Sequence, residues 1–255
     1  MGRGYQHCFS ENDDAMFEKK MRQRKANTMV QVLADHVGAS KLQELSLLNV
    51  GGSAGIIDEY LSRSFNHVTG VDIDENAIKF AKSNFNKENL SFDLGDAMNL
   101  PYESDIFDVV VCSQVYEHVP DAAKMMNEIY RVLVPGGLVY FAASNRLMFN
   151  EPHYNLPLLS VIPRPLAHVY LRIIGRGKYY YEKHYSYWGL KHLVKKYSVT
   201  DFTKKLVSDP EKYGTSYMIS PASFKQTLAK FIAGYLNWLS PGYIWILQKP
   251  SEPSD

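Results

Sequence analysis

Apolar runs and amphipathic stretches alternate along the chain from residue 46 onward. Residues 45–50 form a short apolar run that ends in a glycine turn, and residues 107–112 form a nearly continuous apolar run, as expected for a central strand covered on both faces. From residue 122 to 133 apolar side chains recur at helical spacing behind Asp121, a residue type that caps helices. Strands that alternate with helices predict βαβ units and a parallel sheet.

The same pattern places the other elements. Further strands are expected at 67–73, 90–94 and 138–143, with helices at 57–64 and 75–85. Pro135-Gly136-Gly137 is expected to end the helix that precedes the strand at 138–143. Beyond residue 187 the pattern predicts a helix at 187–196, a strand at 198–203, an amphipathic helix at 222–237 and a final strand at 243–248.

Two segments depart from this alternation. Residues 14–37 resemble a polar, partly basic helical arm, and residues 146–187 are rich in proline and tyrosine without regular periodicity. An irregular segment of that length is typical of a lid or substrate loop. We therefore expect a helical arm (1–42), an α/β core (43–145), a substrate-side insertion (146–187) and the C-terminal part of the same α/β domain (188–255).

Composition constrains the class of protein and its compartment. A hydrophobic share of 45% with 22% charged residues is ordinary for a globular protein and argues against disorder. The apolar stretches at 156–174 and 231–247 are interrupted by proline or polar residues, and the N-terminus has no apolar signal region, so neither a membrane span, nor export, nor a lipid anchor is expected. Two cysteines, Cys8 and Cys112, offer no disulfide framework, which favours a cytoplasmic location.

Charge is segregated along the chain although the net charge is only +1. Residues 47–135 contain 14 acidic and 6 basic residues, whereas residues 146–206 contain 11 basic and 3 acidic residues. Solvated helix faces are the simpler interpretation. The functional interpretation is a basic surface that meets an anionic acceptor or makes peripheral contact with a membrane.

Three polar features follow three successive strands. The glycine turn at 49–55 lets the backbone approach a ligand beside a helix N-terminus. Asp72 ends the second strand, where an acid can bind both hydroxyls of a ribose. Asp96 follows the third strand, where a carboxylate can accept from an adenine amino group. Together they predict a nucleoside-binding site at the carboxyl edge of the sheet.

In these features the sequence resembles the class I S-adenosylmethionine-dependent methyltransferases, particularly the group that contains quinone, sterol and small-molecule methyltransferases. The matching motifs are residues 48–55, 70–74, 95–100, 107–120 and 129–141. The resemblance implies a Rossmann-like α/β fold with a seven-stranded, mostly parallel sheet, helices on both faces and an insertion after the fifth strand. It implies an enzyme whose cofactor is S-adenosylmethionine and whose product is S-adenosylhomocysteine.

The resemblance also implies roles for individual residues. Those expected at the cofactor are Gly51, Ser53, Gly55, Asp72, Ile73, Asp96, Ala97, Ser113 and Gln114. The first three would flank the methionine part, Asp72 would hold the ribose, and Asp96 with Ala97 would contact adenine. Ser113 and Gln114 would lie beside the sulfonium. The sequence departs from the family pattern at Asn49, where an acid is common, and at Ser53, where glycine is usual.

Catalysis and acceptor are less constrained. His118, His153 and His184 are candidate bases for a hydroxyl acceptor, and bracing or surface roles remain open for each. No metal-binding constellation is apparent, so in-line transfer without a metal is expected. The insertion mixes leucines with Arg164, Arg172 and Arg176, which favours a small or amphiphilic, anionic acceptor, lipid-linked or glycan. Whether oxygen, nitrogen or carbon is methylated, and in which oligomeric state, is not encoded in these patterns.

Three other functions compete with methyl transfer. An NAD-dependent oxidoreductase is disfavoured because the dinucleotide fingerprint needs a glycine at the position of Ile56. Nucleic-acid methylation is disfavoured because no Asn-Pro-Pro-Tyr-type motif follows the fourth strand. A non-catalytic S-adenosylmethionine-binding module remains the main alternative.

Overall fold

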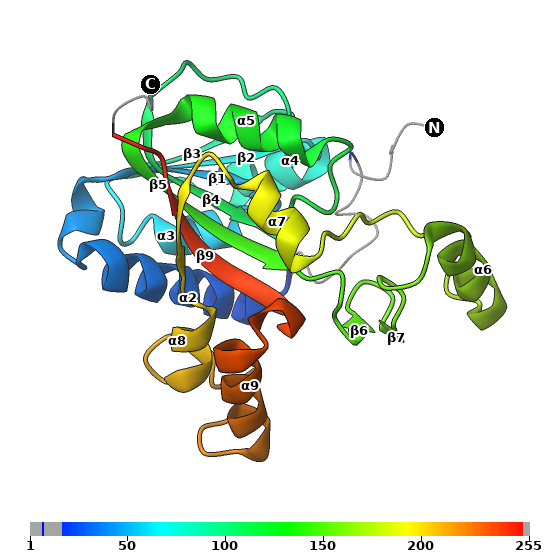
Figure 1. Ribbon diagram of the computed structural model, residues 1–255. Coiled ribbons are helices and arrows are strands. Elements are labelled where there is room, and N and C mark those ends of the chain that lie inside the picture. Colours follow the sequence, from blue (N-terminus) through cyan, green and yellow to red (C-terminus); the bar gives the residue numbers. More distant parts are fainter. Residues whose placement is uncertain (1–6, 8–16, 252–255) are drawn as a thin grey trace.

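The computed structural model describes residue 7 and residues 17–251, and it contains the seven-stranded sheet that the resemblance implied (Figure 1). The strand order is β3-β2-β1-β4-β5-β9-β8. Strands β1 to β5 are parallel, β9 is antiparallel to β5, and β8 is antiparallel to β9. The strands are β1 (Ser46–Val50), β2 (His67–Asp72), β3 (Leu90–Leu94), β4 (Phe107–Ser113), β5 (Leu133–Ser144), β8 (Ser198–Asp201) and β9 (Gly242–Gln248).

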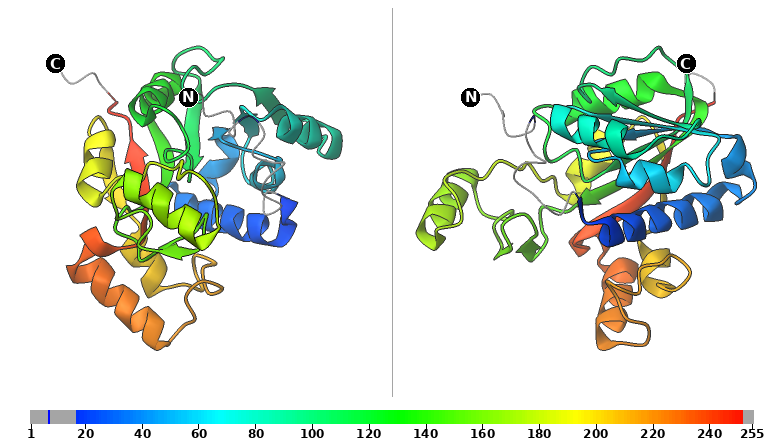
Figure 2. Two further views of the ribbon diagram at one scale, coloured as in Figure 1. Left: turned by 90° about the vertical axis from the view of Figure 1, so that its right-hand side faces the viewer. Right: turned by 180° about the vertical axis from the view of Figure 1, so that it is seen from behind.

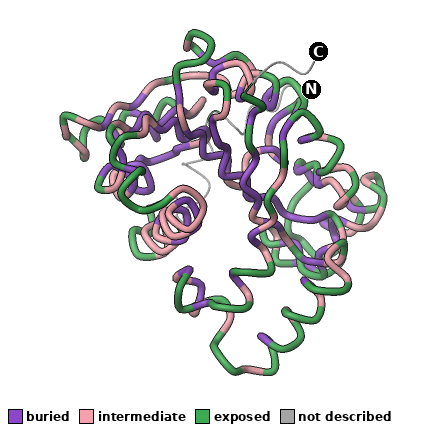
Figure 3. Tube along the Cα trace, turned by 60° about the vertical axis from the view of Figure 1, so that its left-hand side comes forward, coloured by how far each residue is buried: buried purple, intermediate pink, exposed green. Residues whose placement is uncertain are grey.

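Helices cover both faces of this sheet, as Figure 2 shows from two further sides. One apolar cluster packs α5 (Ala122–Val132) and α7 (Tyr187–Leu193) against one face. A second cluster packs α2 (Lys19–Val37), α3 (Ile56–Leu61) and α4 (Glu75–Asn84) against the other. Buried segments are concentrated in the strands between these two layers (Figure 3). The fold class predicted from sequence is thus confirmed.

Helix α2 is more closely integrated than a polar arm would be. Its Ala26, Met29 and Leu33 are buried in the same cluster as Leu47 of β1 and Val109 of β4. The basic residues near its start dominated the sequence pattern, whereas the apolar stripe that follows them packs against the sheet. The first residues of the expected arm, 14–16, lie outside the described residues.

The helix before β5 ends at Val132, before it reaches the Pro135-Gly136-Gly137 stop. Leu133 already pairs with Phe107, and Pro135-Gly136-Gly137 lie inside the strand, beside an irregularity in its register with β4. Lys249, just after β9, explains this difference, because it exchanges backbone hydrogen bonds with Gly136 and Gly137 at 3.1 and 2.9 Å. A pairing with the far end of the chain therefore extends the strand across a sequence that otherwise stops helices.

The insertion at 146–187 has more regular structure than its sequence indicated. It contains a two-stranded sheet of β6 (Asn150–Glu151) and β7 (Leu156–Pro157), followed by α6 (Arg164–Ile174). The apolar cluster of this segment consists of Leu156, Leu159, Ala167, Leu171 and Tyr180. Figure 1 shows α6 standing away from the sheet, beyond β6 and β7.

The C-terminal part contains α8 (Thr203–Ser208) and α9 (Phe224–Tyr235) between β8 and β9. Helix α8 was not expected from the sequence, and α9 lies within the predicted range. None of the described helices is long and apolar enough to cross a bilayer.

Candidate functional site

The glycine turn after β1 brings the backbone close to the loop after β4. Gly51 has a φ of +74°, and a Cβ at this position would lie 2.7 Å from Cγ2 of Val115. Its N–H and that of Gly52 donate to the Val71 carbonyl at the end of β2. Any larger residue at Gly51 would therefore close the space between these two loops.

Asp72 is positioned at the end of β2 by two backbone donors. Its carboxylate accepts hydrogen bonds from Ser53 N–H at 2.8 Å and from Asp74 N–H at 2.9 Å. Burial raises the pKa of Asp72, and these two donors act in the opposite direction. The carboxylate is thus oriented before any ligand binds, in the position predicted for the ribose.

A pocket lies where β1, β2, β3 and β4 end. Its walls include eight of the nine residues predicted at the cofactor: Gly51, Ser53, Asp72, Ile73, Asp96, Ala97, Ser113 and Gln114. Gly55 is the exception and does not line it. A Cβ at Gly55 would lie 2.8 Å from Cβ of Ala81 and 2.7 Å from Cε1 of Phe92, so this glycine permits close packing of α3 against α4 and β3.

Two of the predicted pocket residues accept hydrogen bonds from other residues of the protein through their side chains. Asp96 accepts a hydrogen bond from Met98 N–H at 2.9 Å within the turn after β3. Gln114 has a φ of +58°, and its Oε1 accepts from the Ser144 hydroxyl at 2.6 Å. The side chain of Gln114 is therefore held against the end of β5.

Helix α2 supplies pocket residues that the sequence analysis missed. Arg22, Lys25 and Met29 line the pocket. The available signal was a basic cluster followed by apolar residues at helical spacing, but nothing in that pattern shows which strand edge the helix crosses. The two cations bring positive charge to a pocket that otherwise presents Asp72, Asp74 and Asp96.

The acid missing at Asn49 is replaced from α3. Asp58 is fully buried, and its Oδ1 accepts a hydrogen bond from Asn49 Nδ2 at 2.8 Å. Burial raises the pKa of Asp58 to about 7. An acid therefore still lies behind the glycine turn, although it comes from a different element.

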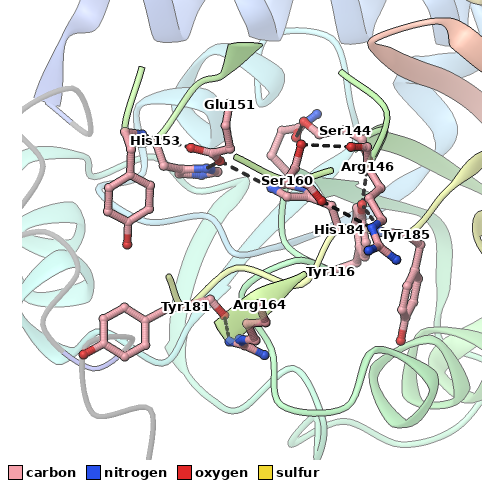
Figure 4. Close-up of polar contacts among 12 residues, drawn as sticks. Tyr116, Ser144, Arg146, Glu151, His153, Ser160, Arg164, Tyr181, His184 and Tyr185 are labelled. Carbon is pink, nitrogen blue, oxygen red and sulfur yellow. Dashed lines mark hydrogen bonds and ion pairs between the residues drawn. The ribbon is translucent and has the colours of Figure 1, made fainter. Parts of the chain in front are cut away.

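The three histidines predicted for catalysis come together at the edge of this pocket. His118 follows β4 and His153 lies in the β6–β7 hairpin; both line the pocket, with ring centroids 4.8 Å apart. His184 lies behind them, 6.1 Å from His153 between ring centroids. Figure 4 shows Glu151 between His153 and His184, with its Oε1 2.6 Å from Nδ1 of the first and 3.4 Å from Nε2 of the second.

Buried carboxylates accompany these histidines. Glu117 and Glu151 have no exposed surface, and Glu182 is 5% exposed. Burial raises the pKa of Glu117 to about 7 and also raises that of Glu182. Burial acts in the same direction on Glu151, but hydrogen bonds from His153 and His184 outweigh it and hold its pKa near 2. No sequence pattern indicated this cluster of carboxylates, because its members come from three separate loops.

The arginines expected to bind an anionic acceptor have other partners. Arg164 donates to the carbonyls of Tyr180 and Tyr181, as Figure 4 shows in part. Arg172 donates to the Lys178 carbonyl, and Arg176 to the Tyr154 carbonyl. None of the three lines the pocket. These hydrogen bonds hold the backbone of the insertion, and the expected role of the three arginines at the acceptor stays a prediction.

Comparison with known proteins agrees with this geometry. A family model described as a methyltransferase domain matches residues 48–141. The ubiquinone biosynthesis O-methyltransferase of Psychrobacter arcticus is 31% identical over 160 residues, which is 60% of this chain and 58% of that protein. The protein of that name from Coxiella burnetii is 32% identical over 102 residues, 39% of this chain and 44% of that protein. The chain thus spans about half the length of these curated relatives.

Solved structures share the fold at low sequence identity. A chain of the complex between the Haloferax volcanii Trm112 methyltransferase activator and a methyltransferase superposes with a TM-score of 0.59 at 15% identity, covering 99% of both chains. A sarcosine dimethylglycine methyltransferase from Galdieria sulphuraria gives 0.55 at 17% identity, covering 89% of this chain and 86% of that one.

The pocket also fits S-adenosylmethionine on its own chemistry. Three features suit an amino acid joined to a nucleoside. They are the space at Gly51 that a Cβ would fill, the buried Ser53 Oγ without a hydrogen-bond partner, and the oriented carboxylate of Asp72. Residues 48–141 therefore match a methyltransferase domain, and the chain has the fold shared by the class I S-adenosylmethionine-dependent methyltransferases.

Proposed function

We propose that this chain methylates a hydroxyl group of a small or amphiphilic acceptor, by in-line transfer from S-adenosylmethionine. The observation that carries the proposal is the position of His118 and His153, which form one wall of the same pocket that holds the strand-end acids. Such a wall suits deprotonation of an acceptor beside the bound cofactor. The name of the curated relatives, O-methyltransferase, supports oxygen as the methylated atom.

S-adenosylmethionine supplies an activated methyl group, so the residues of the chain mainly bind and orient the reactants. Asp72 would accept hydrogen bonds from the ribose hydroxyls, and Asp96 with Ala97 would contact adenine. Arg22 and Lys25 suit the carboxylate of the methionine part, since they are the cations of this pocket. Ser113 and the backbone of Gln114 would lie beside the reacting atoms.

Proton removal falls to the histidines at the pocket wall. His153 is held by the Glu151 carboxylate at Nδ1, which leaves Nε2 to take a proton. His118 lies against it in an edge-to-face arrangement. His184 lies behind Glu151, so we assign it to positioning this pair.

The surface of the insertion bears on the chemical class of the acceptor and on where in the cell the protein meets it. Helix α6 exposes Leu166, Val169 and Ile173, the last with 76% of its surface accessible, beside the basic residues of the insertion. This surface supports an amphiphilic, lipid-linked acceptor and peripheral contact with an anionic membrane. Buried, unpaired Cys112 supports a reducing, cytoplasmic compartment.

The test is methyl transfer from labelled S-adenosylmethionine to a panel of phenolic, lipid-linked and glycan acceptors. We expect label on a hydroxyl oxygen, and we expect His153→Ala to lower kcat by 10²- to 10⁴-fold, the usual range for a lost base, while the affinity for S-adenosylhomocysteine is kept. Binding of the cofactor without transfer to any acceptor would favour the non-catalytic module, and binding of NAD in its place would favour the oxidoreductase.

A further inference from the structure

Three carboxylates and three imidazoles meet where the insertion contacts the loop after β4. They are Glu117, His118, Glu151, His153, Glu182 and His184. Glu117 is fully buried, and neither of its carboxylate oxygens has a hydrogen-bond partner; Oε2 of Glu182 is in the same situation. A buried carboxylate without a donor is costly, so such an arrangement calls for a bound cation or a proton.

The spacing of the candidate ligand atoms fits a single ion. One carboxylate oxygen of Glu117 and one ring nitrogen each of His118 and His153 lie within 4.8 Å of one another. Ligands about 2 Å from a common ion are separated by distances below this value, so small side-chain movements would complete the site. The unpartnered Glu117 carboxylate thus belongs to the same group as the two histidines of the pocket wall.

The surroundings of His153 match those of a metal ligand. Metal-binding histidines commonly donate the second ring N–H to a carboxylate, which fixes the ring. Glu151 lies 2.6 Å from Nδ1 of His153, and His184 lies 3.4 Å from the same carboxylate oxygen. Glu151 also accepts from Tyr154 N–H at 2.9 Å, so it is itself held in place.

We propose that Glu117, His118 and His153 bind a divalent transition-metal cation of the zinc class, with Glu151 orienting His153. Two imidazoles and one carboxylate favour Zn²⁺ and its neighbours over Mg²⁺ or Ca²⁺, which prefer oxygen-only sets. Three protein ligands would leave a coordination position open to the pocket that His118 and His153 line. This inference replaces the expectation of metal-independent transfer that the sequence had suggested.

The consequence for catalysis rests on the proposed function. A hydroxyl group of the acceptor, once bound to the cation, would lose its proton more readily. Glu117, His118 and His153 would then hold the cation rather than act as bases, and the proton of the hydroxyl group would pass to bulk water. An acceptor with a hydroxyl group fits such a site better than an amine or a carbon acid.

Metal binding can be tested without any acceptor. The full chain, freed of metal with a chelator, is titrated with Zn²⁺ by calorimetry and with Co²⁺ by visible absorption, which reports the ligand set. We expect one ion per chain, and at least a 100-fold weaker Kd in Glu117→Gln and in His153→Ala. Glu151→Gln should weaken binding by 10- to 100-fold, as for other outer-shell partners.

The matched control is His192→Ala, which removes an exposed histidine on α7 and should leave the Kd unchanged. Retained binding of S-adenosylhomocysteine shows that each variant is folded. Binding of less than one ion per chain would mean adventitious binding only and would overturn the proposal. Equal affinity in Glu117→Gln and the wild type would do the same, and it is the result expected if the Glu117 carboxyl is protonated and neutral. One tightly bound ion in a protein that methylates no acceptor would support the metal site and contradict the proposed function.

Discussion

Among single residues, we expect cofactor binding to depend most directly on Asp72. We expect Asp72→Ala to weaken binding of S-adenosylhomocysteine by roughly 1–3 kcal/mol, because ribose hydroxyls would lose a charged acceptor in a buried site. Isothermal titration measures this change. Asp93→Ala is the matched control, since Asp93 lies on β3, accepts from the Tyr102 hydroxyl and does not line the pocket. Equal affinity of the Asp72 variant and the wild type would remove Asp72 from the site.

Asp58 gives the fold a pH dependence of its own. Its pKa is raised to about 7, chiefly by burial and in smaller part by the charge of Asp72, while the Asn49 hydrogen bond and the charge of Arg22 act in the opposite direction. The folded state therefore holds this proton more tightly than the unfolded chain, whose aspartates titrate near 3.9. The free energy of unfolding should fall as the pH rises from about 4 to about 7.

Asp58→Asn isolates this effect, since it keeps an acceptor for Asn49 and removes the titration. We expect the variant to gain roughly 1–3 kcal/mol relative to the wild type between pH 5 and pH 8. Urea unfolding of both proteins at the two pH values measures the difference. Parallel pH profiles would show that Asp58 keeps an ordinary pKa in the folded protein.

Hydrogen bonds from arginines hold the segments of the insertion to one another. Arg164, at the start of α6, donates to the carbonyls of Tyr180 and Tyr181, next to Glu182. Replacing it with Gln removes charge-assisted hydrogen bonds worth about 1.5–3 kcal/mol, so amide exchange in α6 should accelerate by about tenfold or more. Arg172→Gln is the comparison, because Arg172 donates to the Lys178 carbonyl and lies over the Tyr179 ring, without a bond to the Tyr180 or Tyr181 carbonyl; a smaller acceleration is expected there. Unchanged exchange in both variants would place the stability of α6 in its apolar cluster alone.

The two parts of the insertion lie at different distances from the pocket. His153 in the β6–β7 hairpin lines the pocket, whereas α6 stands away from it. We expect S-adenosylhomocysteine to slow amide exchange in the hairpin and to leave α6 unchanged, as measured by mass spectrometry. Slowing of both elements together would mean that the whole insertion moves as one lid.

Across the whole molecule, one carboxylate links helix α2 to the C-terminal part of the fold. Asp35 of α2 accepts from Lys205, Lys212 and the Tyr213 hydroxyl in the C-terminal part. Hydrogen bonds from Lys212 and Lys205 lower the pKa of Asp35 well below its usual range. Its contribution to stability is therefore present above about pH 4 and is lost as the pH falls further.

We expect Asp35→Asn to lower the free energy of unfolding by about 1 kcal/mol at pH 7, because this carboxylate is near the surface and partly screened. The difference from the wild type should shrink at pH 3, where part of the native contribution is lost. Thermal unfolding at both pH values measures it. A constant difference would indicate packing, and not charge, as its origin.

The sequence by itself determined the sheet and the cofactor edge. Apolar runs such as 107–112 specify buried strands through local physics, and βαβ connections bring the carboxyl ends of β1 to β4 to one edge. Asp72 and Asp96, which directly follow strands, could therefore be placed at the pocket from their positions alone. Gly55 could not be placed in this way, because its conformation serves packing against Phe92.

Only the tertiary structure decided which loops meet above that edge. His118 and His153 belong to loops, and hydrophobic periodicity does not predict the path of a loop. The contact between these histidines and the burial of the unpartnered Glu117 carboxylate therefore depend on how the insertion folds. The partners of Arg164 also depend on the tertiary structure. Its charge suggested that it binds an anionic acceptor, but its side chain donates to carbonyls of its own segment. Hydrophobic periodicity predicts helices and strands because these elements depend on interactions between residues that are near in sequence. A site built from three loops depends instead on packing across the whole chain.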